Sequence, residues 1–326
     1  MHHWTASDIP SQTGRIAVVT GTGGLGFESA LALARSGAQV IVAGRNEQKG
    51  REAINRIRQL VHDAKVRFER LDLASLGSID AFSIRMLSAL PRLDLLVNNA
   101  AVMTPPRREV TADGFELQLG TNYLGHFALT AQLLPLLQLG MSARVVSVSS
   151  IAGRNGEIQF DDLQFEQSYK PMHAYSQSKL ACLMFALELQ RRSDAAGWGI
   201  QSVAAHPGIA RTELLLNGAG PWSAAGMMRR FFWFLFQPAA RGALPTLFAA
   251  TASQAEAAGY YGPDRLGEVR GHPGPATFPA QALDGKVAAR LWIESERLTG
   301  TSFRALVKRL PETTPAQLDK AAPCVP

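Results

Sequence analysis

The feature that most constrains the fold is an alternation of short apolar segments with longer stretches of helical periodicity along the first 205 residues. Apolar runs of strand length indicate buried strands, and repeated strand–helix–strand units indicate a parallel sheet covered on both faces. We expect an α/β fold with a doubly wound parallel sheet of the Rossmann type. The predicted strands are 15–20, 39–43, 66–70, 93–97, 143–148 and 200–205, and the predicted helices are 25–36, 46–62, 75–89, 113–137 and 173–195.

Domain boundaries follow from the absence of a linker rich in Pro, Gly or Ser that would separate two cores. A single domain is expected over residues 14–300, with an apolar substrate lid near its C-terminal end. Residues 1–13 are expected to form an N-terminal tail, and residues 301–326 a loose C-terminal tail.

Composition excludes several other classes of protein. Two distant cysteines exclude a disulfide framework and favour a reducing compartment, so we expect a cytoplasmic protein. Seven scattered histidines add no metal-ligand pattern, so no metal is expected. The excess basic charge of +6 is spread along the chain, which argues against nucleic-acid binding. The longest apolar run, residues 231–236, is far shorter than the roughly 20 residues that span a bilayer, and no signal-peptide pattern opens the chain.

A glycine-rich segment, TGTGGLG at residues 20–26, lies between the first predicted strand and the first predicted helix. Glycines permit a tight turn, and the N–H groups at the start of the helix attract phosphate, so a dinucleotide site is predicted. A glycine-rich connection without a ligand is the alternative. The second strand is followed by Arg45, where an acidic residue would hold a ribose 2′-hydroxyl. A guanidinium there favours a 2′-phosphate and hence NADP(H), unless Arg45 is simply a surface side chain.

Polar side chains gather where the predicted strands end. Tyr175 and Lys179 are four residues apart on one helix face, and the ammonium is expected to lower the pKa of the phenol. Such a phenol can exchange a proton with a carbonyl or alcohol oxygen. Taken alone, the pair could equally be a packed tyrosine beside a solvated lysine. Asn122 lies in a predicted helix, a poor place for asparagine unless its side chain has local partners. The other polar groups at this sheet edge are Asn98, Asn99, Ser149, Ser150 and Thr212, with Pro207-Gly208 after the sixth strand.

In their order, these motifs resemble those of the classical short-chain dehydrogenase/reductase family, over about residues 14–262. The motifs that carry the resemblance are residues 20–26 (TGTGGLG), 72–73 (DL), 98–100 (NNA), 122–125 (NYLG), 149–150 (SS), 175–179 (YSQSK) and 207–208 (PG). Within the family the chain is most similar to the retinol-dehydrogenase-like and WW-domain-oxidoreductase-like branch. That likeness lies in residues 43–46 (AGRN), 144–146 (RVV), 260–263 (YYGP), 290–292 (RLW) and 298–300 (LTG).

The resemblance implies a role for each matching residue. Tyr175 would be the general acid or base, and Lys179 would bind the nicotinamide ribose. Ser150 would hold the substrate oxygen, and Asn122 would kink its helix and position a water in the proton relay. The residues implied in cofactor binding are Gly21, Thr22, Gly24, Leu25, Gly26, Arg45, Asp72, Leu73, Asn99, Ala100, Tyr175, Lys179, Pro207, Gly208 and Thr212.

Two positions depart from the family pattern. Gly21 and Gly24 are separated by two residues where the family usually has three, which leaves the pyrophosphate geometry open and makes Gly23 a candidate substitute contact. Ala101 stands where the family often has glycine, and contacts made by the backbone should survive that change.

Substrate choice in the family depends on the segment after the sixth strand. Here residues 213–237 are rich in Leu, Met and aromatic side chains, which suits a lid over a bulky lipophilic carbonyl or alcohol. A helix that packs in the core or in a dimer is the alternative. Residues 229–236 combine two arginines with an aromatic run and could instead rest weakly on an anionic membrane surface. The resemblance implies a homodimer or homotetramer, with a monomer as the alternative.

The expected function is hydride transfer between NADP(H) and a lipophilic ketone, aldehyde or alcohol. One alternative is a nucleotide-sugar epimerase or dehydratase of the extended type, which the NNA motif and the apolar lid disfavour. Another is a non-catalytic NADPH-binding regulator. The presence of Ser150, Tyr175 and Lys179 together disfavours it, because binding alone does not require all three.

Overall fold

The computed structural model describes residues 3–210 and 237–303 of the chain, and in them an eight-stranded sheet has the order β3-β2-β1-β4-β5-β6-β7-β8. Its neighbouring strands pair in parallel except β7 with β8. The predicted doubly wound α/β fold is confirmed. The strands are β1 (Ile16–Thr20), β2 (Gln39–Gly44), β3 (Val66–Arg70), β4 (Leu95–Asn98), β5 (Arg144–Val148), β6 (Gln201–Ala205), β7 (Tyr260–Arg265) and β8 (Arg270–Pro275).

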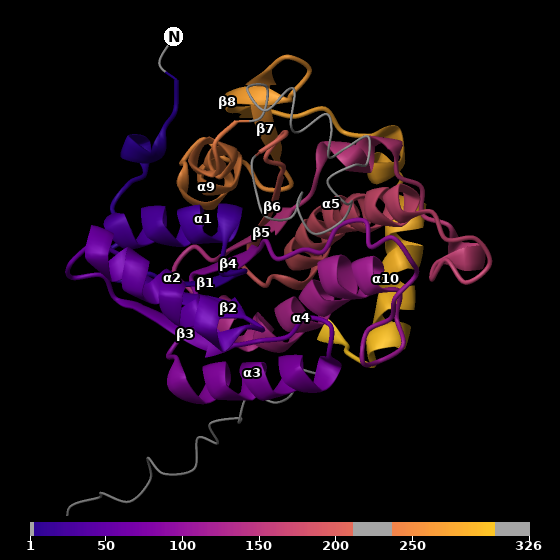
Figure 1. The fold of residues 1–326 in the computed structure, drawn as a ribbon, viewed down its shortest axis with the longest axis horizontal. Coiled ribbons are helices and arrows are strands. Elements are labelled where there is room, and N and C mark those ends of the chain that lie inside the picture. The colour runs from indigo at the N-terminus through magenta and orange to yellow at the C-terminus, as the bar shows by residue number, and fades with distance from the viewer. Residues whose placement is uncertain (1–2, 211–236, 304–326) are drawn as a thin grey trace, which may run out of the picture.

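Helices cover both faces of the sheet (Figure 1). Helices α3, α4, α5 and α10 pack on one face, and α1, α2 and α9 on the other. The α-helices are α1 (Gly24–Arg35), α2 (Glu47–Leu60), α3 (Leu76–Ala89), α4 (Gly125–Gln138), α5 (Pro171–Ala196), α8 (Ala239–Gly242), α9 (Leu244–Thr251) and α10 (Gly285–Thr299). The shorter elements are η1 (Ala6–Asp8), η2 (Leu119–Leu124), η3 (Ile151–Asn155), η4 (Phe160–Asp162) and η6 (Ala280–Leu283).

The central strands are apolar on both faces because each face is covered. In β1, Ile16 and Val18 belong to one hydrophobic core, whereas Ala17 and Val19 belong to the other. Successive side chains of a strand point to opposite faces, so a strand between two helical layers needs an unbroken apolar run. This is why the strands could be located from their composition. The antiparallel strand β8 could not be located in this way, because its sequence RGHPGP contains two glycines and two prolines. It lies at an edge of the sheet, where such residues are tolerated.

The helix predicted over 113–137 differs most from the structure. Gly114 adopts a left-handed backbone conformation with φ +85°, so residue 113 lies in a turn and not in a helix. The helical segment that follows contains a π-helical stretch, η2, before α4 begins at Gly125. In this stretch the N–H of Gly125 donates to the carbonyl of Gly120, five residues earlier.

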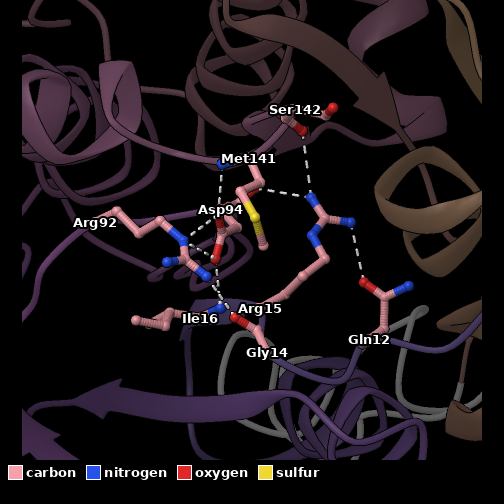
Figure 2. A network of polar contacts seen from close by, with 8 residues as sticks. All are labelled: Gln12, Gly14, Arg15, Ile16, Arg92, Asp94, Met141 and Ser142. Carbon is pink, nitrogen blue, oxygen red and sulfur yellow. Dashed lines mark hydrogen bonds and ion pairs between the residues drawn. The ribbon is translucent and has the colours of Figure 1, made fainter.

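A buried carboxylate ties together the amino ends of the central strands (Figure 2). Asp94 is fully buried just before β4 and accepts from the N–H groups of Ile16 at 2.7 Å and Met141 at 2.6 Å. Arg92 donates to the same carboxylate at 3.0 Å, and Arg15 donates to the Asp94 carbonyl at 3.1 Å. This network lies at the sheet edge opposite the carboxyl ends of the strands. It therefore stabilises the sheet without taking part in a site at those ends.

Candidate active site

The order of the sheet reverses at β1 and β4, and ligands of doubly wound sheets bind beyond the carboxyl ends of strands at such a point. β1 ends at Thr20 and α1 begins at Gly24, so the predicted glycine turn lies here. No side chain caps α1, no acidic residue stands in its first turn, and a Cβ at Gly23 would meet nothing within 4 Å. The first N–H groups of α1 are therefore suited to a phosphate group.

Two glycines of the turn are required by its own packing. Gly21 has φ +100°, and a Cβ there would lie 2.8 Å from Asn99 Nδ2. A Cβ on Gly26 would lie 2.4 Å from the Gly21 carbonyl oxygen. The shortened turn thus closes on itself and on Asn99, whose amide also donates to the Thr20 carbonyl at 2.7 Å. In this arrangement Gly23, just before α1, is an open glycine of the turn.

A cavity of about 180 Å³ continues from the turn along the ends of β2 and β4. Arg45 contributes an exposed guanidinium to its lining, and no carboxylate follows β2 directly. At the other end the lining includes Val102 and Thr121, next to Asn122. The residues predicted for the cofactor that line this cavity are Gly21, Thr22, Arg45, Asp72, Leu73 and Ala100. The uncapped start of α1 and the turn are suited to the phosphate groups of a dinucleotide, and the cavity beside them, with Arg45 in its lining, is suited to another part of it.

The proposed catalytic side chains come together beyond β5 and at the start of α5. Tyr175 is 5% exposed and Lys179 is 3% exposed. Burial raises the pKa of the Tyr175 phenol to about 12, and the hydrogen bond with Ser150 opposes that rise. Lys179 donates to the Val148 carbonyl at 2.9 Å, and it is not among the groups that shift the pKa of Tyr175. The pKa of Tyr175 is therefore raised and not lowered as predicted, because removal of the phenol from water dominates.

The raised pKa has a chemical consequence. At neutral pH the Tyr175 hydroxyl is protonated and can donate its proton to an oxygen beside it. Ser150 is the serine whose side chain contacts Tyr175. The hydroxyl of Ser149 donates instead to the backbone carbonyl of Lys179 at 2.7 Å, so it ties β5 to α5.

Asn122 lies within η2, and its amide has three hydrogen-bond contacts. Oδ1 accepts from the Val102 N–H at 2.8 Å, while Nδ2 donates to the Val102 carbonyl at 3.0 Å and to Ser178 Oγ at 2.9 Å. The side chain therefore fastens the segment after β4 to α5. These contacts explain how asparagine is accommodated inside a helical segment. The backbone of that segment is π-helical, and such stretches are often found at functional sites.

The turn after β6 is held by a charged cluster. The N–H of Gly208 donates to His206 Nδ1 at 3.2 Å, and His206 Nε2 lies 2.8 Å from Glu268, which also pairs with Arg154. Gly208 has φ +63°, and a Cβ there would lie 2.3 Å from the Val269 carbonyl. Pro207 and Gly208 are thus fixed beside the site. Thr212, almost all of the predicted lid and the possible membrane contact at 229–236 lie outside the described residues.

Several buried polar groups near the site are absent from the sequence-based predictions. They are the Thr20 hydroxyl, His126, Ser178 and Cys182. One signal was available for His126, which follows Asn122 by four residues and so shares its helix face.

Two kinds of feature are absent from the described residues, a helix that could span a membrane and a metal-binding group of side chains. None of the helices in the described ranges combines the length and apolar character needed to cross a bilayer. Within the same ranges, His, Cys, Asp and Glu side chains nowhere gather in a group that could hold a metal ion.

Comparison with known proteins identifies the class to which this fold and site belong. The chain belongs to the short chain dehydrogenase family, which matches residues 15–218. It is 41% identical to the mouse polyprenol dehydrogenase over 297 residues, covering 90% of this chain and 86% of the relative. It is 42% identical to the mouse retinol dehydrogenase 13 over 295 residues, covering 89% and 85%. The crystal structure of a Mycobacterium paratuberculosis protein matches with a TM-score of 0.77 and 39% identity, covering 93% of this chain and 99% of that one.

These relatives confirm the predicted retinol-dehydrogenase-like branch. The chain is therefore an oxidoreductase that acts on CH–OH or C=O groups, and family membership supports a nicotinamide cofactor. Neither alternative function from the sequence analysis is favoured by the comparisons.

Proposed function

We propose that this protein uses NADP(H) to interconvert a lipophilic alcohol and its aldehyde or ketone. The observation that carries the proposal is the hydrogen bond between Ser150 and a protonated Tyr175, on a helix that Asn122 ties to the segment after β4. That segment lines a cavity that extends to Arg45 and the glycine turn. A guanidinium at that place complements a 2′-phosphate, whereas a carboxylate would repel it. The names of the relatives, retinol and polyprenol dehydrogenases, support a lipophilic alcohol as the substrate class.

The chain's own residues account for binding, orientation and proton transfer. The N–H groups at the start of α1 would hold the pyrophosphate, and Arg45 the 2′-phosphate. When bound, the nicotinamide would supply or accept the hydride. Ser150 would orient the substrate oxygen toward Tyr175, whose hydroxyl proton is available for donation to that oxygen in reduction. Asn122 keeps the segment after β4 fixed against α5, which bears Tyr175.

The test follows the absorbance of reduced nicotinamide with each of three carbonyl compounds: retinal, a polyprenal and a short water-soluble ketone. NADPH oxidation is expected with at least one lipophilic carbonyl and not with the short ketone. Replacement of NADPH by NADH should lower the rate at equal concentration. Cofactor binding without turnover of any carbonyl would contradict the proposal and favour a regulator, and preference for NADH would contradict the assignment of Arg45.

The remaining predictions from the sequence accompany this proposal. The lid over residues 213–237, the single-domain boundaries at 14 and 300, the cytoplasmic location and the oligomeric state stay predictions. The weak membrane contact through residues 229–236 is a prediction of the same kind.

A further inference from the structure

His126 lies in the first turn of α4 and contacts two separate parts of the site. His126 is 3% exposed. Nε2 lies 2.9 Å from Thr20 Oγ1, at the end of β1, and Nδ1 lies 2.9 Å from the Asn122 carbonyl oxygen in η2. A single imidazole therefore bridges the strand that leads into the glycine turn and the segment that carries Asn122.

The hydrogen bonds of Thr20 determine which ring nitrogen carries the proton. Thr20 Oγ1 accepts from the N–H groups of Asn99 at 2.9 Å and Ala100 at 3.0 Å. A hydroxyl oxygen has two lone pairs and one proton, so these bonds leave the proton for His126 Nε2, which is closer than the Val97 carbonyl at 3.2 Å. Since a carbonyl can only accept, Nδ1–H donates to Asn122. The ring is thus neutral, and burial, which lowers its pKa, agrees with this.

The bridge continues into the catalytic helix. The Asn122 carbonyl accepts a second bond from Cys182 Sγ at 3.1 Å, so α5 also holds it. The Asn122 amide donates to Ser178 Oγ, and that hydroxyl donates to the Tyr175 carbonyl at 2.8 Å. An unbroken series of buried polar contacts therefore runs from the end of β1 through His126 to the backbone of the residue that would donate the proton.

We propose that His126 is a positioning residue that couples the cofactor-binding turn to the catalytic segment. Its Nε2 holds Thr20, and with it Asn99 and Ala100, against α4. Its Nδ1 holds the carbonyl of Asn122 and so sets η2 relative to the same strand ends. Loss of each bond should therefore affect a different step. The inference rests on the proposed function, because the two steps are cofactor binding and turnover.

Two conservative variants separate the two bonds. In His126→Asn the amide nitrogen can replace Nδ1 and keep the Asn122 bond, while the Thr20 bond is lost. In His126→Gln the longer amide reaches the Nε2 position and keeps Thr20, while the Asn122 bond is lost. A buried partner left without its hydrogen bond changes an equilibrium or a rate by about tenfold. H126N should therefore raise the Kd for NADPH about tenfold, and H126Q should lower kcat about tenfold. The kcat of H126N and the Kd of H126Q for NADPH should stay within about twofold of the wild-type values.

The measurements are NADPH binding by its fluorescence, kcat with the best carbonyl of the panel, and the free energy of unfolding in urea. Thr130→Val is the matched control, since it removes a buried hydroxyl of α4 that bonds Asn98 and the His126 carbonyl but not the ring. It should lose stability without changing either constant. Thr20→Val should raise the Kd for NADPH, because it removes the His126 bond together with the acceptor of the Asn99 and Ala100 N–H groups. Adding H126N to Thr20→Val should raise the Kd no further, because the bond between Thr20 and His126 is already lost.

Each outcome decides the inference. The inference is supported if H126N changes mainly the Kd for NADPH, H126Q changes mainly kcat, and the effects of T20V and H126N on the Kd are not additive. Constants equal to those of the wild type in both His126 variants would overturn it. A rise in the Kd for NADPH and a fall in kcat by equal factors in both variants would also overturn it, since such changes indicate only a damaged core. A wild-type protein that does not bind NADPH would overturn the proposed function itself, and this inference with it.

Discussion

The neutral His126 ring should make the protein sensitive to mild acid. Burial lowers the pKa of His126 from 6.5 to about 4, and the nearby Lys179 ammonium adds to that lowering. Between these values the unfolded chain binds a proton that the folded chain does not bind, so the free energy of unfolding falls as pH drops below about 6.5. From pH 7 to pH 5 the loss caused by this residue is about 2 kcal/mol. Above pH 7 this residue should cause almost no further change in the free energy of unfolding.

The assay is urea denaturation of the wild type and of His126→Asn at both pH values. Asparagine keeps the Asn122 bond but cannot titrate, so the wild type should lose about 2 kcal/mol more than the variant between pH 7 and pH 5. His206, whose pKa burial also lowers, is present in both proteins and cancels in the comparison. The exposed His62 supplies the control His62→Asn, which should follow the wild type at both pH values.

Equal acid losses in the wild type and His126→Asn would refute the reasoning about burial. A wild type that gains stability in acid relative to the variant would refute the assigned tautomer. That result would mean that the ring is charged and donates from both nitrogens, with a pKa raised above that of the unfolded chain.

Three further changes test the site and the core. Tyr175→Phe should lower kcat at least about a hundredfold and leave the Kd for NADPH within about twofold; steady-state rates and fluorescence titration check this, and normal turnover would exclude Tyr175 as the acid. Arg45→Asp should lower the ratio of kcat/KM with NADPH to that with NADH by about tenfold or more, and an unchanged ratio would place the phosphate contact elsewhere. Asp94→Ala should lower the free energy of unfolding in urea by about 3 kcal/mol, because two buried N–H groups lose their acceptor, while kcat stays unchanged; a loss below about 1 kcal/mol would contradict the network.

The sheet and the location of the site could be predicted because both depend on local patterns. Strands covered on both faces must be largely apolar, and β1, β2, β4 and β5 are apolar over most of their length. The carboxyl ends of parallel strands then meet at one edge, which brings Thr20, Asn99 and Ser150 together however far apart they are in the sequence. The edge strand β8 and the π-helical stretch η2 do not depend on such patterns. The first is rich in Gly and Pro, and the second is a π-helical stretch that the sequence pattern did not distinguish from the α-helix that follows it.

The protonation state of the site could not be predicted, because it depends on burial and on contacts between distant residues. The spacing of Tyr175 and Lys179 indicated that they share a helix face, and from that alone the ammonium should lower the pKa of the phenol. In the structure the Lys179 ammonium bonds the Val148 carbonyl, and burial raises the pKa of Tyr175 instead. The His126 tautomer likewise depends on Thr20, 106 residues away. Residue types at fixed spacing therefore indicate which groups can react, whereas the packing of the sheet and helices around them decides which groups hold the protons.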